Sequence, residues 1–254
     1  MRFDTAQISL IGNRPENQDR TEILRAEGSL LAIVADGMGG HARGALAAET
    51  AVASLGASFR DDRSPRDPDE FLRAALACAH ATVFALGKDK SFTQRPGTTA
   101  VCALVSGEEL RWVHVGDSRA YHFRAARLLD RSRDHTRIES RLAAGEISPE
   151  AASLHPDRHV VEYCLGVLED SPPAEVSAAR RLEPGDVVLL CSDGFWSQLD
   201  EERIGERLAT GERLAPAIRA LAEEAASGAN PHSDNVSAVA LRVAADSQAD
   251  PCGS

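Results

Sequence analysis

The sequence predicts an α+β fold with mostly antiparallel sheets, and three observations support this prediction. Strand-like segments occur in blocks near both ends and in the middle of the chain. Helical segments come in pairs between those blocks, without the regular strand–helix alternation of a parallel, doubly wound sheet. Hydrophobic residues make up 43% and charged residues 26% of the 254 residues, which is enough apolar material for one sizeable core.

The first part of the chain contains two strand signals followed by two helix signals. Apolar runs predict strands at 6–11 and 30–35. Apolar residues then recur at helical spacing over 43–59 and again up to about residue 83. The second helix is expected to begin after Asp67, which supplies an N-cap, with Pro68 at the first helical position and Glu70 three residues after the cap.

The rest of the chain returns to strands and ends in a short polar segment. Gly107 and two glutamates indicate a hairpin turn between two of these strands. We expect one domain over residues 1–244 and a disordered tail at 245–254, where the residues are small and polar. Strands are predicted at 98–105, 111–115, 120–123, 187–191 and 236–243, and helices at 136–153 (interrupted), 200–209 and 214–226.

Composition disfavours several classes of partner and location. The formal net charge of −11 repels the phosphate backbone and anionic lipid, so we expect neither nucleic acid nor a membrane surface as a partner. The five cysteines are scattered, without a C-x-x-C pair, which is typical of a reducing compartment. No signal segment or bilayer-length apolar run is visible. A cytoplasmic protein is therefore expected.

Five aspartates lie at strand ends. Asp36, Asp117 and Asp193 each follow an apolar strand directly, Asp19 follows the first strand, and Asp234 precedes the last. Each one alone is most simply part of a turn, because Asp beside Gly, Ser or Asn commonly marks one. Together, the five could converge at one edge of a sheet, where they would repel one another unless cations neutralised them.

The type of ligand indicates the type of metal. Carboxylate oxygens without a His or Cys cluster favour hard cations, so Mg²⁺ or Mn²⁺ is preferred over Zn²⁺. Two such ions about 4 Å apart can lower the pKa of a bridging water and stabilise in-line attack on phosphorus. Arg14, near Asp19 in the sequence, is the candidate for gripping a substrate phosphate, because guanidinium binds phosphate through two hydrogen bonds. The alternative for Arg14 is a solvated loop residue.

The ordered set of motifs resembles a known family. Order and spacing match from about residue 5 to 243, and although a single Asp-Gly is a weak signal, the full set is specific. The chain resembles the bacterial metal-dependent serine/threonine protein phosphatases of the 2C class. The matching motifs are Arg14-x-x-Asn17-Gln18-Asp19, Asp36-Gly37-Met38-Gly39-Gly40-His41, Gly97-Thr98-Thr99, Gly116-Asp117-Ser118-Arg119, Ser192-Asp193-Gly194 and Asp234-Asn235.

The resemblance implies both a fold and an activity. The fold is a four-layer α-β-β-α sandwich, in which two antiparallel sheets are flanked by helix pairs and the metals lie at one end of the sheets. The activity is hydrolysis of phosphoserine and phosphothreonine on proteins by a metal-activated bridging water. The implied partners are phosphorylated protein substrates, in opposition to a Ser/Thr kinase, and we expect a monomer.

The resemblance also implies a metal ligand set. Asp36 would bridge the first two ions, and the carbonyl of Gly37 would bind the second. Asp193 and Asp234 would complete the shell of the first ion. Asp19 would act near the second ion, through water. The implied cofactors are two Mn²⁺ or Mg²⁺ ions.

Further residues take their roles from the same resemblance. Asp117 would help to hold a third, weaker ion, shared with Asp193, and Arg14 would bind the substrate phosphate. Asn17 and Asn235 would hold the loops around the ligands. Gln18 stands where many relatives have glutamate, which removes one negative charge near the second ion.

The resemblance implies the general acid and the flap over the active site less directly. His41 is the candidate general acid, because it is the histidine nearest to the metal motif, five residues after Asp36. A loop histidine is an equal alternative, and a metal-bound water could donate the proton instead. Residues 145–166 resemble the variable flap that covers the active site in this family.

Two other functions remain as alternatives. A non-catalytic regulator on the same fold would bind phosphoproteins without hydrolysis, and its mark would be loss of the metal aspartates, yet all five remain. A hydrolase of small phosphoesters is the second alternative, although no G-x-x-x-x-G-K loop for a nucleotide is present. The carboxylate constellation favours the protein phosphatase.

Overall fold

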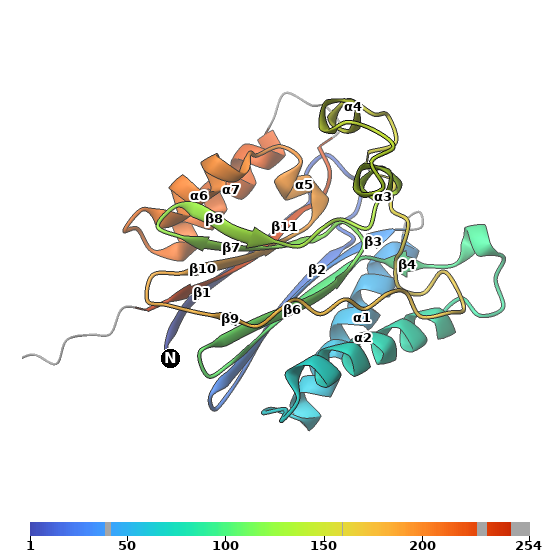
Figure 1. The fold of residues 1–254 in the computed structure, drawn as a ribbon. Helices are drawn as coiled ribbons and strands as arrows, with labels where there is room; N and C mark the ends of the chain where they lie inside the picture. The colour runs from blue at the N-terminus through green and yellow to red at the C-terminus, as the bar shows by residue number, and fades with distance from the viewer. Residues whose placement is uncertain (39–41, 159, 228–232, 245–254) are drawn as a thin grey trace, which may run out of the picture.

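The chain folds into four layers, with two β-sheets stacked face to face and helices on both outer faces (Figure 1). The computed structural model describes residues 1–38, 42–158, 160–227 and 233–244. The strand pairings in both sheets are antiparallel. The α+β prediction and the expected sandwich are therefore confirmed, while the predicted tail at 245–254 lies outside the described residues.

The first sheet joins the two ends of the chain. Its strand order is β1-β11-β10-β7-β8, so the first and last strands lie side by side. Ile8 faces Ala238 in this pairing, and Leu190 of the next strand faces Val239. The strands are β1 (Phe3–Leu10), β7 (Arg119–Arg124), β8 (Arg127–Arg131), β10 (Val187–Cys191) and β11 (Val236–Val243).

The second sheet is built mainly from the first half of the chain. Its order is β2-β3-β5-β6-β9, and β4 pairs with the end of β3. Gly107, with a φ of 62°, forms the predicted turn between β5 and β6. The strands are β2 (Asp19–Ala26), β3 (Ser29–Met38), β4 (Gly97–Thr98), β5 (Ala100–Ser106), β6 (Glu109–Val115) and β9 (Arg180–Arg181).

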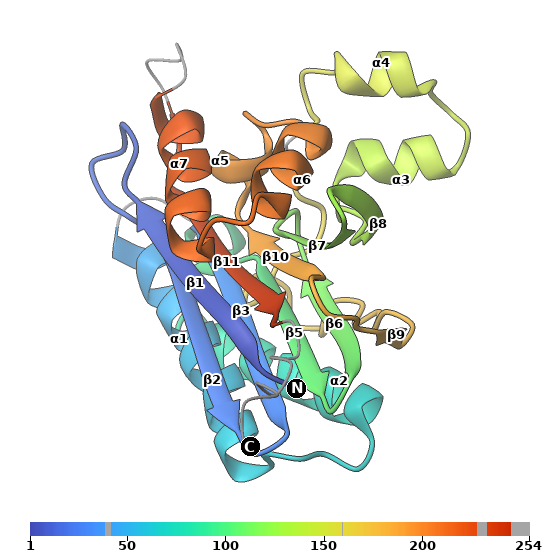
Figure 2. The same ribbon diagram turned by 90° about the vertical axis from the view of Figure 1, so that its left-hand side faces the viewer.

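Helices cover the outer face of each sheet. The pair α1 (Ala42–Asp61) and α2 (Pro68–Ala85) packs on the second sheet, and α6 (Glu201–Ala209) and α7 (Leu214–Ser227) pack on the first. The short helices α3 and α4 stand beyond the strand ends, on the same side as α5 (Figure 2). These shorter elements are η1 (Phe92–Gln94), α3 (Arg137–Ala143), α4 (Pro149–Ser153) and α5 (Asp193–Trp196). None of the described helices is long and apolar enough to cross a bilayer.

Strand periodicity divides the core into three layers. Along β3, residues 30, 32 and 34 pack between the two sheets, and residues 31, 33 and 35 pack against α1 and α2. Both faces of β3 are buried, which explains why its sequence is one continuous apolar run. With aromatic residues at only 4%, the buried positions are filled mostly by Ala, Leu and Val. The sandwich core holds the strand ends, and therefore the aspartates that follow them, in fixed places.

Most predicted elements are present, with a few omissions. The strands at 187–191 and 236–243 match their predictions, and Asp67 caps α2 by accepting hydrogen bonds from the amides of Asp69 and Glu70. The interrupted helix at 136–153 is α3 followed by α4. Three strands, β2, β8 and β9, and the single turn of α5 were not predicted.

Candidate metal centre

Two of the predicted ligands are brought together by the register of one strand pair. β2 and β3 are antiparallel, and Asp19 at the start of β2 lies directly opposite Asp36 near the end of β3. Gly37 follows, and its amide donates to the carbonyl of Gln18 at 3.2 Å. A Cβ atom at Gly37 would come within 2.1 Å of the Gly44 carbonyl oxygen, so this position needs glycine for α1 to approach β3.

A hydrogen bond between the sheets joins these residues to the other half of the site. Asp193 begins α5 directly after β10, and its neighbour Ser192 donates from Oγ to Asp19 Oδ2 at 2.8 Å. The Ser192 hydroxyl also accepts from the amide of Ser237 in β11 at 3.0 Å. Asp234 lies two residues before the start of β11. No role for Ser192 is predicted from the sequence, yet its hydroxyl connects β2 of the second sheet to β11 of the first.

Asp117 occupies a tight turn between β6 and β7. Gly116 has a φ of 96°, which favours glycine, and a Cβ there would clash with Thr99. Thr99 Oγ1 lies 2.7 Å from Ser118 Oγ and accepts from the amide of Asp36 at 3.1 Å. The threonine therefore connects the Asp117 turn to the strand that carries Asp36. Thr99 belongs to one of the motifs found in the sequence. Its contact with the amide of Asp36, however, depends on how β3 pairs with β4 and β5.

Burial, and then the charges of the neighbouring aspartates, raise the pKa values of Asp19, Asp36 and Asp117, as expected for carboxylates that lie close together. Burial raises the pKa of Asp19 to about 7, and the charges of Asp193 and Asp234 add to the effect. Burial raises the pKa of Asp36 well above its usual range, and the other four aspartates of the cluster all contribute. For Asp117, burial and then the charge of Asp193 raise the pKa to about 8. Such a cluster can be fully ionised near neutral pH only beside a compensating positive charge.

The donor set fits hard divalent cations. Asp19 Oδ1 is buried and accepts no hydrogen bond from the described chain, so it presents a bare oxygen inside the cluster. Among the described residues, the Asp, Glu, His and Cys side chains form no ready-made group of three around one point. Backbone carbonyls and water would therefore have to supply part of any coordination shell, which is typical of Mg²⁺ and Mn²⁺ rather than Zn²⁺.

Arg14 lies beside the cluster on the loop that connects β1 to β2. Its Nη2 atom is 2.6 Å from Asp234 Oδ2, and the two side chains are 53% and 36% exposed. The side chain of Asn235 closes this loop: its Nδ2 donates to the carbonyls of Ile11 and Glu16 at 2.8 and 3.0 Å, and its Oδ1 accepts from the backbone amide of Gln18 at 2.8 Å. The loop is thus fastened to the segment before β11 that carries Asp234.

The other polar residues singled out in the sequence hold the same loop. Asn17 donates from Nδ2 to Ser9 Oγ at 2.7 Å and accepts from the amide of Asp19 at 3.0 Å. The side-chain nitrogen of Gln18 lies next to Gly44 near the start of α1. His41, the candidate general acid, lies outside the described residues.

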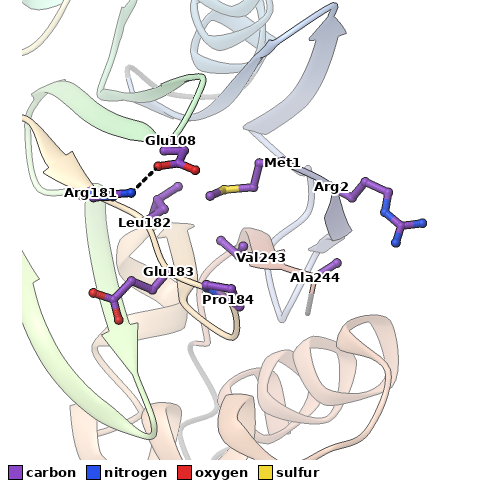
Figure 3. A pocket seen from close by; sticks show the side chains of 9 residues that line it. All are labelled: Met1, Arg2, Glu108, Arg181, Leu182, Glu183, Pro184, Val243 and Ala244. Carbon is purple, nitrogen blue, oxygen red and sulfur yellow. Dashed lines mark hydrogen bonds and ion pairs between the residues drawn. The ribbon is translucent and has the colours of Figure 1, made fainter. Parts of the chain in front are cut away.

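One cavity lies away from this centre. About 590 Å³ in volume, it is lined by Met1, Leu182 and Val243 together with the ion pair of Glu108 and Arg181 (Figure 3). Val243 ends β11, whereas the aspartates gather where β11 begins. The cavity and the aspartates therefore lie at opposite ends of the sandwich.

Comparison with known proteins agrees with this geometry. The protein phosphatase 2C family profile matches residues 9–232. The serine/threonine protein phosphatase PstP of Mycobacterium tuberculosis is 35% identical over 216 residues, which cover 85% of this chain and 41% of PstP. This chain thus spans less than half the length of that relative. The serine/threonine phosphatase stp of Listeria monocytogenes is 30% identical over 79% of this chain and 77% of its own length.

A solved structure extends the similarity to three dimensions. The catalytic domain of PstP, determined in complex with two manganese ions, superposes with a TM-score of 0.79 at 31% identity. The superposition covers 96% of this chain and 99% of that domain. Fold, motif order and the convergence of the aspartates agree with the family match. The chain belongs to the protein phosphatase 2C family.

Proposed function

We propose that this chain hydrolyses phosphoserine and phosphothreonine esters on proteins in a metal-dependent reaction. The observation that carries the proposal is the convergence of five aspartates from both sheets at one end of the sandwich. Carboxylates packed this closely need a cationic partner, and their oxygens suit Mg²⁺ or Mn²⁺. Retention of all five aspartates argues against a non-catalytic regulator on the same fold.

The proposed ligand set follows the resemblance stated above. Asp36 would contact two ions, Asp193 and Asp234 would complete the first shell, and Gly37 and Asp19 would serve the second. Asp117 would contribute to a weaker third ion. The two manganese ions in the PstP catalytic domain support the choice of cation. Bound divalent ions supply acidification of the attacking water and neutralisation of charge on the phosphoryl group.

The chain's own residues would orient the substrate. Arg14 bonds Asp234 from a loop fastened by Asn235, and its guanidinium would bind phosphate oxygens beside the aspartates. Asp19 is held by Ser192, which fixes one carboxylate oxygen, while Oδ1 is buried and accepts no hydrogen bond from the described residues. For the departing serine or threonine oxygen, His41 remains the candidate proton donor from the protein.

Partners, boundaries and location belong to the same proposal. The substrates would be phosphoproteins modified by a Ser/Thr kinase, because the similar proteins carry serine/threonine phosphatase names. Residues 1–244 would form one catalytic domain, with residues 145–166 as a flap near the site, and act as a monomer. The described cysteines are all free, which supports a cytoplasmic location.

Hydrolysis of a phosphothreonine peptide tests the proposal. Turnover should require Mn²⁺ and stop in chelator. Asp193→Asn should lower kcat/KM by about 100-fold or more, since even residues that only support metal ligands cost 10–100-fold. The exposed Asp61→Asn serves as a matched control and should retain activity. Well-folded wild-type protein without metal-dependent turnover would refute the catalytic function.

A further inference from the structure

The indole of Trp196 connects two of the candidate metal ligands. The short helix α5 has Asp193 as its first residue and Trp196 as its last. Trp196 Nε1 donates a hydrogen bond to the backbone carbonyl of Asp117 at 2.8 Å. This helical turn thus carries Asp193, and its tryptophan binds the backbone of Asp117, which lies 79 residues away from Trp196 in sequence.

Arg119 stacks over the ring of this indole. Its guanidinium carbon lies 3.4 Å from the centroid of the Trp196 ring. Arg119 also makes two parallel bonds to Asp134, at 2.7 and 2.6 Å, and the two side chains are only 14% and 10% exposed. Cation–π and two-point ion-pair contacts are stronger when they are withdrawn from water. The ring is therefore held in a single orientation.

The turn around Asp117 is fixed at its flanking residues as well. The carbonyl of Gly116 accepts from the amide of His135 at 2.9 Å, and Ser118 bonds Thr99 at 2.7 Å. Together with the Trp196 contact, three successive residues are tied to three different segments. The turn therefore has little freedom to move relative to Asp193.

A second stack of the same composition lies elsewhere in the fold. Arg180 places its guanidinium carbon 3.9 Å from the ring centroid of Trp112 and donates from Nε to Asp130 at 2.8 Å. Trp112 is 3% exposed, inside β6. It lies five residues before Asp117, roughly 17 Å along an extended strand. This second Trp–Arg–Asp stack provides an internal control.

We propose that Trp196 is a positioning residue: its indole N–H holds Asp117 at the distance from Asp193 that lets both carboxylates bind one ion. This inference rests on the proposed function, because it concerns the same centre. Arg119 and Asp134 act by keeping the indole in place. Ligands that are ordered in advance lose less freedom on binding, and loss of such a supporting contact typically lowers metal affinity 10–100-fold.

Calorimetric titration with Mn²⁺ in the absence of substrate tests the inference. Trp196→Phe removes the N–H donor and keeps a ring under Arg119, while Trp112→Phe makes the same change in the second stack. The Trp112→Phe protein should bind the same ions as the wild type. Trp196→Phe should lose 10–100-fold in affinity for one ion and keep the tighter binding. Unchanged affinity for every ion in Trp196→Phe would overturn the inference.

Fluorescence gives a second, independent readout. Each variant retains a single tryptophan, and Mn²⁺ quenches an indole close to it. In the Trp112→Phe protein, Trp196 emission should fall with the midpoint of the weaker calorimetric site. In the Trp196→Phe protein, Mn²⁺ should quench the emission of Trp112 less than it quenches that of Trp196 in the other variant. A Trp196 signal that ignores Mn²⁺ at concentrations filling that site would contradict the proposed contact.

Another pair of variants covers the case in which Trp196→Phe fails to fold. Arg119→Lys retains the charge but loses the planar stack and the two-point bond, and Arg180→Lys is its matched control. The inference is supported if Arg119→Lys binds one ion more weakly than the wild type and Arg180→Lys does not. It is overturned if the two variants bind every ion with equal affinity. A folded wild-type protein that binds no Mn²⁺ would refute the proposed function itself. Wild-type binding that Trp196→Phe and Arg119→Lys leave unaltered would refute only the positioning role.

Discussion

Arg14 differs from the aspartates of the centre in being half exposed. It bonds Asp234 Oδ2 through Nη2 at 2.6 Å. A guanidinium has five N–H donors, so this bond leaves others to face an incoming phosphate. In the proposed function, Arg14 would therefore bind a carboxylate of the centre and a substrate phosphate at the same time.

Replacing Arg14 by glutamine should mainly weaken substrate binding. Hydrogen bonds to charged groups contribute about 1.5–3 kcal/mol, so kcat/KM for a phosphothreonine peptide should fall about ten- to hundredfold, chiefly through KM. Steady-state kinetics at saturating Mn²⁺ measure the effect. Arg25→Gln is the control, because Arg25 bonds Thr5 in β1, away from the aspartates. An unchanged KM in Arg14→Gln would contradict the phosphate-binding role.

The sequence predicts which aspartates are candidate ligands, but it does not predict the contacts that hold them in place. Aspartates that follow apolar strands can be recognised because the strand signal and the turn residue are adjacent in sequence. The hydrogen bonds of Ser192, Thr99 and Trp196 cannot be recognised in this way. Each of these hydrogen bonds joins two segments that are distant in sequence, and no local sequence pattern predicts how such segments approach each other.

The same distinction holds for secondary-structure elements. β10 is apolar throughout because both of its faces are buried, so its limits were predicted correctly. β2 and β8 are edge strands with half-buried, charged residues, and neither shows clean alternation. α5 is only four residues long, too short for helical periodicity to appear.

The junction between β7 and β10 contains a buried ionic cluster. Asp186, directly before β10, is fully buried and accepts from Arg124 at 2.7 and 2.8 Å. His122 Nε2 lies 2.9 Å from the same carboxylate. Burial alone would raise the pKa of Asp186, but these hydrogen bonds outweigh it and the pKa is lowered. The cluster fastens the start of one strand to the end of its neighbour.

This cluster predicts how stability depends on pH. A carboxyl with a lowered folded-state pKa contributes stability above its unfolded pKa, about 3.9, and that contribution is lost as pH falls through the folded value. Asp186→Asn should cost about 3 kcal/mol at pH 7, as expected when one partner of a buried ion pair is removed. The difference from wild type should shrink toward pH 3.

Urea unfolding at pH 7 and pH 3 measures both quantities. Glu223→Gln is the control, since Glu223 belongs to an exposed pair with Arg219 and should change stability by less than about 1 kcal/mol. A constant difference between Asp186→Asn and wild type across this pH range would refute the ionic explanation.

On the scale of the whole molecule, the centre is shared between the sheets. Asp19 and Asp36 belong to the second sheet, whereas Asp193 and Asp234 flank strands of the first. The Ser192–Asp19 bond crosses between them. A cation held by both groups would therefore resist separation of the two sheets and stabilise the entire sandwich.

Metal should accordingly raise the thermal stability. At a free Mn²⁺ concentration 100 times Kd, the folded state gains about 2.7 kcal/mol. For a chain of this size, that corresponds to a rise in Tm of roughly 5–10 °C over the value in chelator. Asp36→Asn should abolish most of the shift, and Asp61→Asn should retain it. Scanning calorimetry that finds no shift in the wild type would refute binding across the sheets.

The position of β1 at the edge of its sheet has a consequence for biosynthesis. In the strand order β1-β11-β10, β1 is translated before the other strands of its sheet and pairs only with β11, which is translated after them. At 5–20 residues per second, β1 waits roughly 10–50 seconds for that partner. Asp234 arrives on the same late segment. Until this segment has been translated, a nascent chain lacks both the pairing partner of β1 and one aspartate of the candidate centre, so the centre cannot form earlier.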